Sequence, residues 1–395
     1  MALNLSRNSR LFISTVTAGF DSTNTWEVQM QDGFSFSQGI DSTEITVSEA
    51  GATPTRGAET FNSALQPADW AFTSYMRSYV DAGAATIQTT EAILWHALAT
   101  NATPDFGLAG VPNARGQLDR FHVDFEDSDH HELAKIHLLF NVDNVWYRIS
   151  DCQVNQADID FSIDGIAMVA WSGQGTVLRD ITDTPSAYPD IITPEIVAGT
   201  DPTVVAVGAR GVASTDGGTG NTTATEYLAV PSSATYIKNK LSTLSLVGAR
   251  VGQNDNTIAY AIAITGGNLS ITNNITYITP ETLSIVDTPI GSFSGARSMT
   301  GQLTCYLDTK DNGSSTLIRN LSNNLSTKNS YSMVLNLGGP SGPRVVFALP
   351  YAQLAVPVIE VADVLGLNID FAAQGANGIE AAADMSEISI EYFNA

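Results

Sequence analysis

The second half of this chain repeats the first half in pattern, although few residues are identical. Residues 151–175 align without a gap with residues 351–375, so that Gln153 matches Gln353 and Trp171 matches Phe371. Four more anchors follow in the same chain order: Phe34–Phe36 with Leu269–Ile271, Thr73–Met76 with Thr304–Leu307, Ile93-Leu94 with Leu317-Ile318, and Leu139–Asn141 with Val334–Asn336. A large unit present twice indicates a duplicated domain, because solenoid repeats are only about 20–50 residues long. Chance similarity between two all-β segments is the alternative.

Period-two alternation of apolar and polar residues dominates both halves and predicts β-strands. The alternating segments are Trp26–Met30, Glu44–Val47, Ile159–Ile163 and Leu269–Thr272. Val345–Leu349 is continuously apolar and is therefore predicted to be a strand buried on both faces.

Each half contains about one helical signal. Thr90 is predicted to cap a helix over residues 91–98, whose apolar residues at 93, 94, 97 and 98 share one face. Its counterpart covers residues 314–325. The predicted fold is therefore mainly β, with two duplicated β-sandwich or barrel domains at 1–180 and 236–395, each with one α-helix on its outside.

Two segments fall outside this pattern. Residues 181–235 are rich in Pro, Gly and Thr and are predicted to be an interdomain linker. The loop Ser48–Glu59 joins two predicted strands and is longer than most hairpin loops. Long loops on a rigid sheet often make contacts, so its candidate contact residues are Glu49, Thr53, Pro54, Arg56 and Glu59; a loop without any contact role is the alternative.

The charge of the chain restricts its partners. There are 41 acidic and 18 basic residues, and the formal net charge is −23. Binding to DNA through its phosphates requires Lys and Arg, so this balance disfavours a DNA-binding protein. An acidic chain can simply be soluble, or it can present a surface that must not hold a polyanion.

The cysteines and the chain start indicate where the protein is made. Cys152 and Cys305 lie in different halves at non-equivalent positions and are expected to be unpaired, which fits synthesis in a reducing compartment. The start of the chain lacks the basic and apolar regions of a signal peptide. No apolar run approaches the roughly 20 residues of a membrane helix, so no membrane insertion is expected.

A search for catalytic and cofactor motifs finds none to support an enzyme. The polar cluster from His122 to Glu132 lacks the second His of a zinc-protease motif and reads more simply as a solvated acidic edge. Asp158, Asp160 and Asp164 lack the calcium-hand pattern. Gly291–Gly295 has Phe293 where a nucleophile elbow needs Ser. No metal, cofactor or catalytic residue is therefore predicted.

Several segments spread over both halves carry a resemblance to a known family. They are residues 23–36, 41–51, 54–57, 94–98, 236–241, 264–267, 273–277, 289–295 and 363–366. In these segments the chain resembles the major tail tube proteins of T-five-type long-tailed bacteriophages (siphoviruses). Two departures from that family are expected: a longer 181–235 linker, and no room after Ala395 for the immunoglobulin-like domain that some members carry.

The resemblance implies a structural virion protein. Three two-domain chains would form a pseudo-hexameric ring, and stacked rings would form a tube whose acidic channel lets DNA pass into the host without specific binding. The implied partners are other copies of the chain and the tape measure, tail terminator and tail tip proteins. The implied location is the tail of the virion, after synthesis in the cytoplasm of the host bacterium. A two-domain β-sandwich adhesin or binding module, and a β-sandwich glycoside hydrolase, are the alternatives; the hydrolase lacks a plausible carboxylate pair.

Overall fold

The computed structural model of the chain describes thirteen segments. They are residues 9–14, 25–45, 59–81, 86–100, 120–125, 133–142, 145–182, 236–249, 258–279, 288–323, 330–361, 364–375 and 387–393. The predicted linker lies outside them, apart from Ile181 and Thr182.

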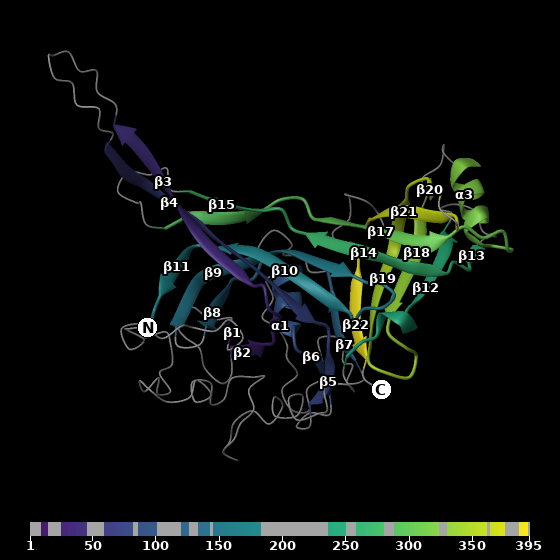
Figure 1. The fold of residues 1–395 in the computed structure, drawn as a ribbon, viewed down its shortest axis with the longest axis horizontal. Helices are drawn as coiled ribbons and strands as arrows, with labels where there is room; N and C mark the ends of the chain where they lie inside the picture. The colour runs from purple at the N-terminus through teal and green to yellow at the C-terminus, as the bar shows by residue number, and fades with distance from the viewer. Residues whose placement is uncertain are drawn as a thin grey trace, which may run out of the picture.

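The structure is mainly β, as the period-two alternation predicted (Figure 1). The first half contains helix α1 (Ala92–Ala99) and the strands β1 (Ser9–Ser14), β2 (Thr25–Val28), β3 (Ser35–Ile45), β4 (Glu59–Tyr75), β5 (Ser78–Asp81), β6 (Thr86–Thr89), β7 (Phe121–Asp124), β8 (Ile136–Val142), β9 (Val145–Asp160), β10 (Met168–Gly175) and β11 (Val177–Asp180). The second half contains the 3-10 helix η5 (Asn239–Leu241), helix α3 (Ser314–Asn323) and the strands β12 (Thr243–Ala249), β13 (Ile258–Tyr260), β14 (Ile264–Thr272), β15 (Ile275–Ile278), β16 (Gly291–Ser294), β17 (Ser298–Tyr306), β18 (Ser330–Leu337), β19 (Arg344–Leu354), β20 (Val358–Glu360), β21 (Gly366–Ala373) and β22 (Ser389–Phe393).

Both halves follow one order of antiparallel strand pairing. In the first half the order is β2-β1-β8-β9-β10-β4-β3, with β11 also paired to β9. In the second half the order is β13-β12-β18-β19-β21-β17-β14, with β22 also paired to β19. A bulge also recurs at the matched place of both halves. In the β8–β9 ladder it follows the pair Ile136–Cys152, and in the β18–β19 ladder it follows the pair Tyr331–Ala352.

The next hairpin differs in register between the halves. Gln153 of β9 faces Gln174 of β10, whereas Gln353 of β19 faces Ala372 of β21. The gap-free sequence alignment of residues 151–175 with 351–375 is therefore wrong by two residues in the second strand of this hairpin. The reason is that the connection is two residues shorter in the second half: residues 161–167 join β9 to β10, whereas residues 361–365 join β20 to β21.

A glycine faces a large aromatic ring at the matched site of both halves, with the two partners exchanged between the strands. In the first half Trp70 of β4 faces Gly173 of β10. In the second half Gly301 of β17 faces Phe371 of β21. A Cβ on Gly173 would lie 2.2 Å from the Gln153 carbonyl oxygen and 2.5 Å from the Trp70 ring. Each ring therefore occupies the space that a side chain on the facing strand would need.

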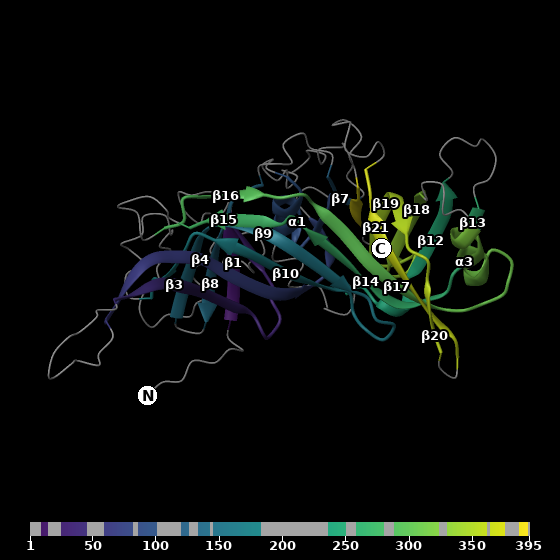
Figure 2. The same ribbon diagram turned by 90° about the horizontal axis from the view of Figure 1, so that it is seen from above.

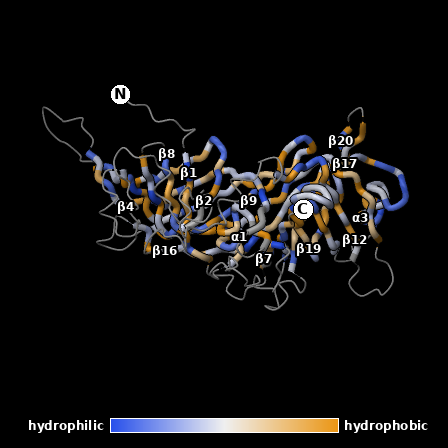
Figure 3. The backbone as a smooth tube through the Cα atoms, turned by 90° about the horizontal axis from the view of Figure 1, so that it is seen from below, coloured by the Kyte–Doolittle hydropathy of each residue, from blue (hydrophilic) through white to orange (hydrophobic). Residues whose placement is uncertain are grey.

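The two halves are joined into one continuous sheet by the pairing of β9 with β14. Asp160 faces Asn268 and Gln156 faces Thr272. The sheet then runs β3-β4-β10-β9-β14-β17-β21-β20, and β14 extends across the first half into the β15–β16 hairpin (Figures 1 and 2). Hydrophobic and hydrophilic residues interleave along these strands (Figure 3).

Buried polar groups secure the joint between the halves. The Asn273 amide is 2% exposed and donates to the carbonyl oxygens of Leu98 and Val154, at 2.8 and 3.2 Å. The Tyr277 hydroxyl donates to the Asp151 carbonyl oxygen at 2.6 Å. Because unsatisfied buried polar groups are costly, these bonds fix how the β15–β16 hairpin lies on the first half.

Helix α1 is buried on almost every side, which corrects the predicted outer helix. His96 alone among its residues is only partly buried. The helix packs against β9 and β7, and Tyr392 of β22 reaches it through hydrogen bonds with Trp95 and Glu91. Trp95 donates through Nε1 to the Tyr392 hydroxyl at 2.9 Å. The helix α3 of the second half covers Ser314–Asn323 of the predicted 314–325, with Leu317 and Leu321 buried.

The predicted capping role of Thr90 is wrong. Its hydroxyl donates to Oε2 of Glu91 at 2.6 Å, and Tyr392 donates to Oε1 of Glu91, also at 2.6 Å. Glu91 itself occupies the N-cap position, without a side-chain bond to the helix backbone. Its burial raises its pKa, and the hydrogen bonds from Thr90 and Tyr392 oppose that shift.

Replacing Glu91 by Gln is expected to flatten the pH dependence of stability. The folded pKa lies above the ordinary value of 4.5, so the contribution of wild-type Glu91 is fully present below pH 4.5 and is lost as pH rises through the folded pKa. Each unit between the two pKa values corresponds to about 1.4 kcal/mol. Urea unfolding over a pH series should show the variant gaining stability relative to wild type above pH 4.5. If the wild-type protein instead gained stability relative to the variant above pH 4.5, the raised pKa of Glu91 would be contradicted.

Other local expectations have mixed outcomes. Val345–Leu349 forms part of β19, but its burial alternates, because Val346 and Ala348 are only partly buried. The strand predicted over Ile159–Ile163 ends at Asp160, and Ile163 is exposed in the following turn. Cys152 and Cys305 are both free and buried, as expected.

Candidate functional site: an acidic sheet face between two open edges

On one face of the joined sheet the outward side chains are mostly polar, and the charged ones among them are all acidic. Along each strand, buried side chains alternate with outward ones. The outward carboxylates are Asp69, Asp158, Asp160, Glu360 and Asp370. Lys and Arg are absent from β3, β4, β10, β14, β17, β20 and β21. Arg148 of β9 lies in the other half of that strand, opposite Arg179 of β11.

Neutral amides hold most of these carboxylates in place. Three of the amide nitrogens lie close to their acceptors: Gln174 donates to Asp69 at 2.9 Å, Gln156 to Asp158 at 2.8 Å, and Gln302 to Asp370 at 2.7 Å. Asn368 donates to Glu360 in the same way. An amide satisfies a carboxylate oxygen without cancelling its charge. The face is therefore ordered and still negative.

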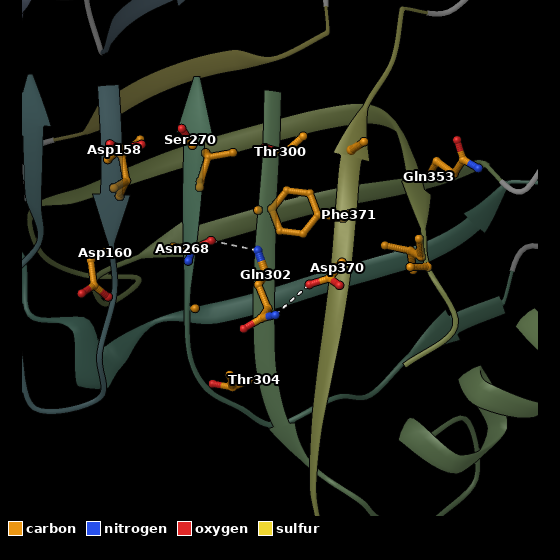
Figure 4. Close-up of a pocket in the computed structure, with 17 residues that line it drawn as sticks. Asp158, Asp160, Asn268, Ser270, Thr300, Gln302, Thr304, Gln353, Asp370 and Phe371 are labelled. Atoms are coloured by element: carbon orange, nitrogen blue, oxygen red, sulfur yellow. Dashed lines mark hydrogen bonds between the residues drawn. The ribbon is translucent and has the colours of Figure 1, made fainter. Parts of the chain in front are cut away.

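A shallow hollow of about 840 Å³ lies on this face across β9, β14, β17 and β21 (Figure 4). Asp158, Asp160 and Asp370 line it together with Asn268 and Gln302. Figure 4 shows these side chains spread along neighbouring strands. No group of three His, Cys, Asp or Glu residues in the described part of the chain could hold a metal ion. The described groups of the hollow therefore offer a polar surface lined by carboxylates and amides.

Both ends of the sheet are strand edges with exposed apolar side chains. Within the described segments, β3 pairs only with β4, and β20 pairs only with β21. Ile40 of β3 is 55% exposed, and Val358 and Ile359 of β20 are 61% and 49% exposed. An open edge presents unpaired backbone groups that can pair with another chain. These two edges and the acidic face between them form the candidate site.

Of the site residues predicted from the sequence, only Glu59 lies in the described part of the chain. Glu49, Thr53, Pro54 and Arg56 are outside the described residues. Glu59 is the first residue of β4, is exposed and faces Ile45 of β3. The β3–β4 hairpin extends away from the body of the molecule (Figure 1).

The sequence did not single out the acidic face. Asp158 and Asp160 do not fit a calcium motif, but their alternation with Ala157 and Ile159 places them on one side of a strand. Asp69 and Asp370 join them only through strand pairing. Of the polar cluster from His122 to Glu132, His122 lies in β7, with its Nε2 3.0 Å from the Ser389 hydroxyl.

Comparison with known proteins adds one match. No protein-family model matches the chain. The chain is 37% identical over 376 residues to the tail tube protein pb6 of Escherichia phage T5. The aligned region covers 94% of this chain and 73% of that protein. Among the described residues, no helix is long and apolar enough to span a membrane.

Proposed function

The chain belongs to the T5-type major tail tube proteins, and from this membership we propose that it assembles with other copies of itself into a tube for DNA. A tail tube protein is a structural part of the virion tail. We propose further that the chain holds two duplicated tube domains, 1–180 and 236–395, joined by the linker 181–235. Three chains then supply six domains to each ring.

The observation that carries the proposal is the joined sheet with an open edge at each end. Each half contributes matched strands to it in matched order, and the β9–β14 pairing already joins one domain to the next. Repeating that step between chains leaves no edge unpaired once the ring closes. A head-to-tail contact between identical chains forms a closed ring when the rotation between neighbouring chains adds up to a full turn.

The acidic face supports the assignment of a channel. If this face lines the lumen, DNA meets carboxylates and amides but no Lys or Arg from its strands. Like charges repel, so the phosphates find no group to bind, and the duplex can slide. This role needs no catalytic residue or cofactor.

The remaining partners follow from the position of a tube in a tail. Tape measure, tail terminator and tail tip proteins are the expected neighbours of the lumen and of the two tube ends. Synthesis in the host cytoplasm fits the two free, buried thiols.

Electron microscopy of the purified protein tests the proposal. We expect rings of three chains and stacks of such rings. Single two-domain particles at every protein concentration would favour the alternative, an adhesin or binding module built from two β-sandwiches.

Deleting Gly51–Gly57 is expected to shorten the tubes without unfolding the subunit. We propose that Glu49, Thr53, Pro54, Arg56 and Glu59 contact the next ring, because the β3–β4 hairpin that carries this loop extends beyond the body. An exposed loop contributes little to the core, so thermal unfolding should stay close to wild type. Electron microscopy should show rings or short stacks, and tubes of normal length would count against this role of the loop.

A further inference from the structure

The β9–β14 pairing, which joins the two halves of the chain, shows which backbone groups a strand must offer to a neighbouring strand at a sheet edge. The Asn155 carbonyl accepts from the Asn273 N–H at 2.8 Å, and the Phe161 N–H donates to the Gly267 carbonyl at 3.0 Å. In an antiparallel ladder, alternate residues direct their backbone groups to the same side. Ala157 lies between these two residues in the same alternation and faces Ile271. Its N–H is therefore directed at β14.

A proline stands at the matched position of the open edge. The shared bulge aligns Cys152 with Ala352, and the same offset aligns Ala157 with Pro357. Strand β9 runs unbroken through this position, whereas β19 ends at Leu354 and β20 begins at Val358. Proline has no N–H to donate, so the open edge is one hydrogen bond short of the joint inside the chain.

The side chains around Pro357 point to a second copy of this chain as the occupant. Val356, Val358 and Ile359 are 47%, 61% and 49% exposed. At the other end of the same sheet, β3 pairs with β4 alone among the described strands, and its Ile40 is 55% exposed. The continuity of this edge with the β9–β14 joint indicates that β3 of another copy continues the sheet.

We propose that residues 356–360 of one copy pair antiparallel with residues 35–39 of a second copy, and that Pro357 weakens this pairing enough to delay assembly of free subunits. The inference rests on the proposed tube function. In the joint inside the chain Asp158 faces Ser270. The matched Trp70–Gly173 and Gly301–Phe371 pairs align Asp69 with Thr300, so Ser37, which faces Asp69, corresponds to Ser270, which faces Thr300. Val358 therefore stands opposite Ser37, and the sequence match of Phe34–Phe36 with Leu269–Ile271 is wrong by two residues. Proline is a recognised means by which edge strands avoid premature pairing.

A disulfide cross-link tests the register. The pair Ser37→Cys and Val358→Cys should link copies when assembled rings are oxidised, because facing residues in antiparallel strands suit a disulfide. Non-reducing gels should show a ladder that ends at three chains. The matched control, Asp158→Cys with Ser270→Cys, should cross-link within one chain only. The native Cys152 and Cys305 are 0% and 2% exposed and should not contribute.

The substitution Pro357→Ala tests the delay. Restoring one backbone donor should lower the protein concentration at which rings and tubes appear by about two- to tenfold, as expected for one hydrogen bond. Pro340→Ala, in an exposed turn between β18 and β19, is the control and should leave that concentration unchanged. Light scattering over a concentration series gives the threshold.

The outcomes separate this inference from the tube function. Normal tubes that show no Ser37–Val358 cross-link, or an unchanged threshold for Pro357→Ala, would overturn the inference and leave the tube proposal standing. A wild-type protein that forms neither rings nor tubes at any concentration would overturn both.

Discussion

Replacing Gly173 by valine is expected to destabilise the subunit by more than about 3 kcal/mol. A Cβ at this position would lie 2.2 Å from the Gln153 carbonyl oxygen and 2.5 Å from the Trp70 ring. The backbone oxygen belongs to the neighbouring strand of a ladder, and the ring is 2% exposed, so neither can move away without disrupting the sheet. Soluble yield and urea unfolding followed by tryptophan fluorescence measure the effect.

A glycine in a less crowded strand is the control for this substitution. Gly291 of β16 has no heavy atom within 4 Å of the place where a Cβ would stand. Gly291→Val should therefore change the free energy of unfolding by less than about 0.5 kcal/mol. Equal losses at Gly173 and Gly291 would show that any strand glycine is sensitive and that the Trp70 ring is not the cause.

Replacing Asp158, Asp160 and Asp370 by lysine is expected to turn the assembled tube into a DNA-binding tube. Each substitution exchanges a negative charge for a positive one on the acidic face, and the change repeats in every copy. Neutralising phosphates releases counterions, so affinity for a short DNA duplex should rise by at least about tenfold near 50 mM salt and decline steeply as salt increases. Co-sedimentation of the duplex with tubes, over a salt series, measures both effects.

The matched control carries the same charge change elsewhere. Asp32, Asp164 and Asp311 are exposed in turns outside the strands of the acidic face. Their replacement by lysine should raise co-sedimentation much less, because separated surface charges do not line a common channel. If both triple variants retained DNA equally, the net charge of the tube would account for the result, and the proposal that the acidic face lines the channel would be contradicted.

The strand-rich fold and its helices could be predicted because their signals are local. Alternation of apolar and polar residues is a property of neighbouring residues, as in Leu269–Thr272 of β14. The apolar positions of α1 were also visible in the sequence. The hydrogen bond that Trp95 makes was not, because its partner Tyr392 lies at the far end of the chain.

The acidic face required knowledge of which strands are neighbours. Asp370 gains its amide partner from β17 and Asp69 gains its partner from β10. Register is equally non-local: sequence matching aligned Trp171 with Phe371, whereas the ladders place Phe371 at the site of Gly173. The length and composition of the loop at 48–59 predict a contact role, and this role stays a prediction.

The exchanged ring and glycine also affect how the coding sequence can change. A recombination event that fused the start of one repeat to the end of the other would pair β4 with β21, bringing Trp70 against Phe371. The reverse fusion would pair β17 with β10 and set Gly301 against Gly173, leaving a hole. Neither hybrid repeat would pack well. A crossover that falls between the two paired strands therefore leaves a mismatched site, and the exchange discourages recombination at that place within the repeat.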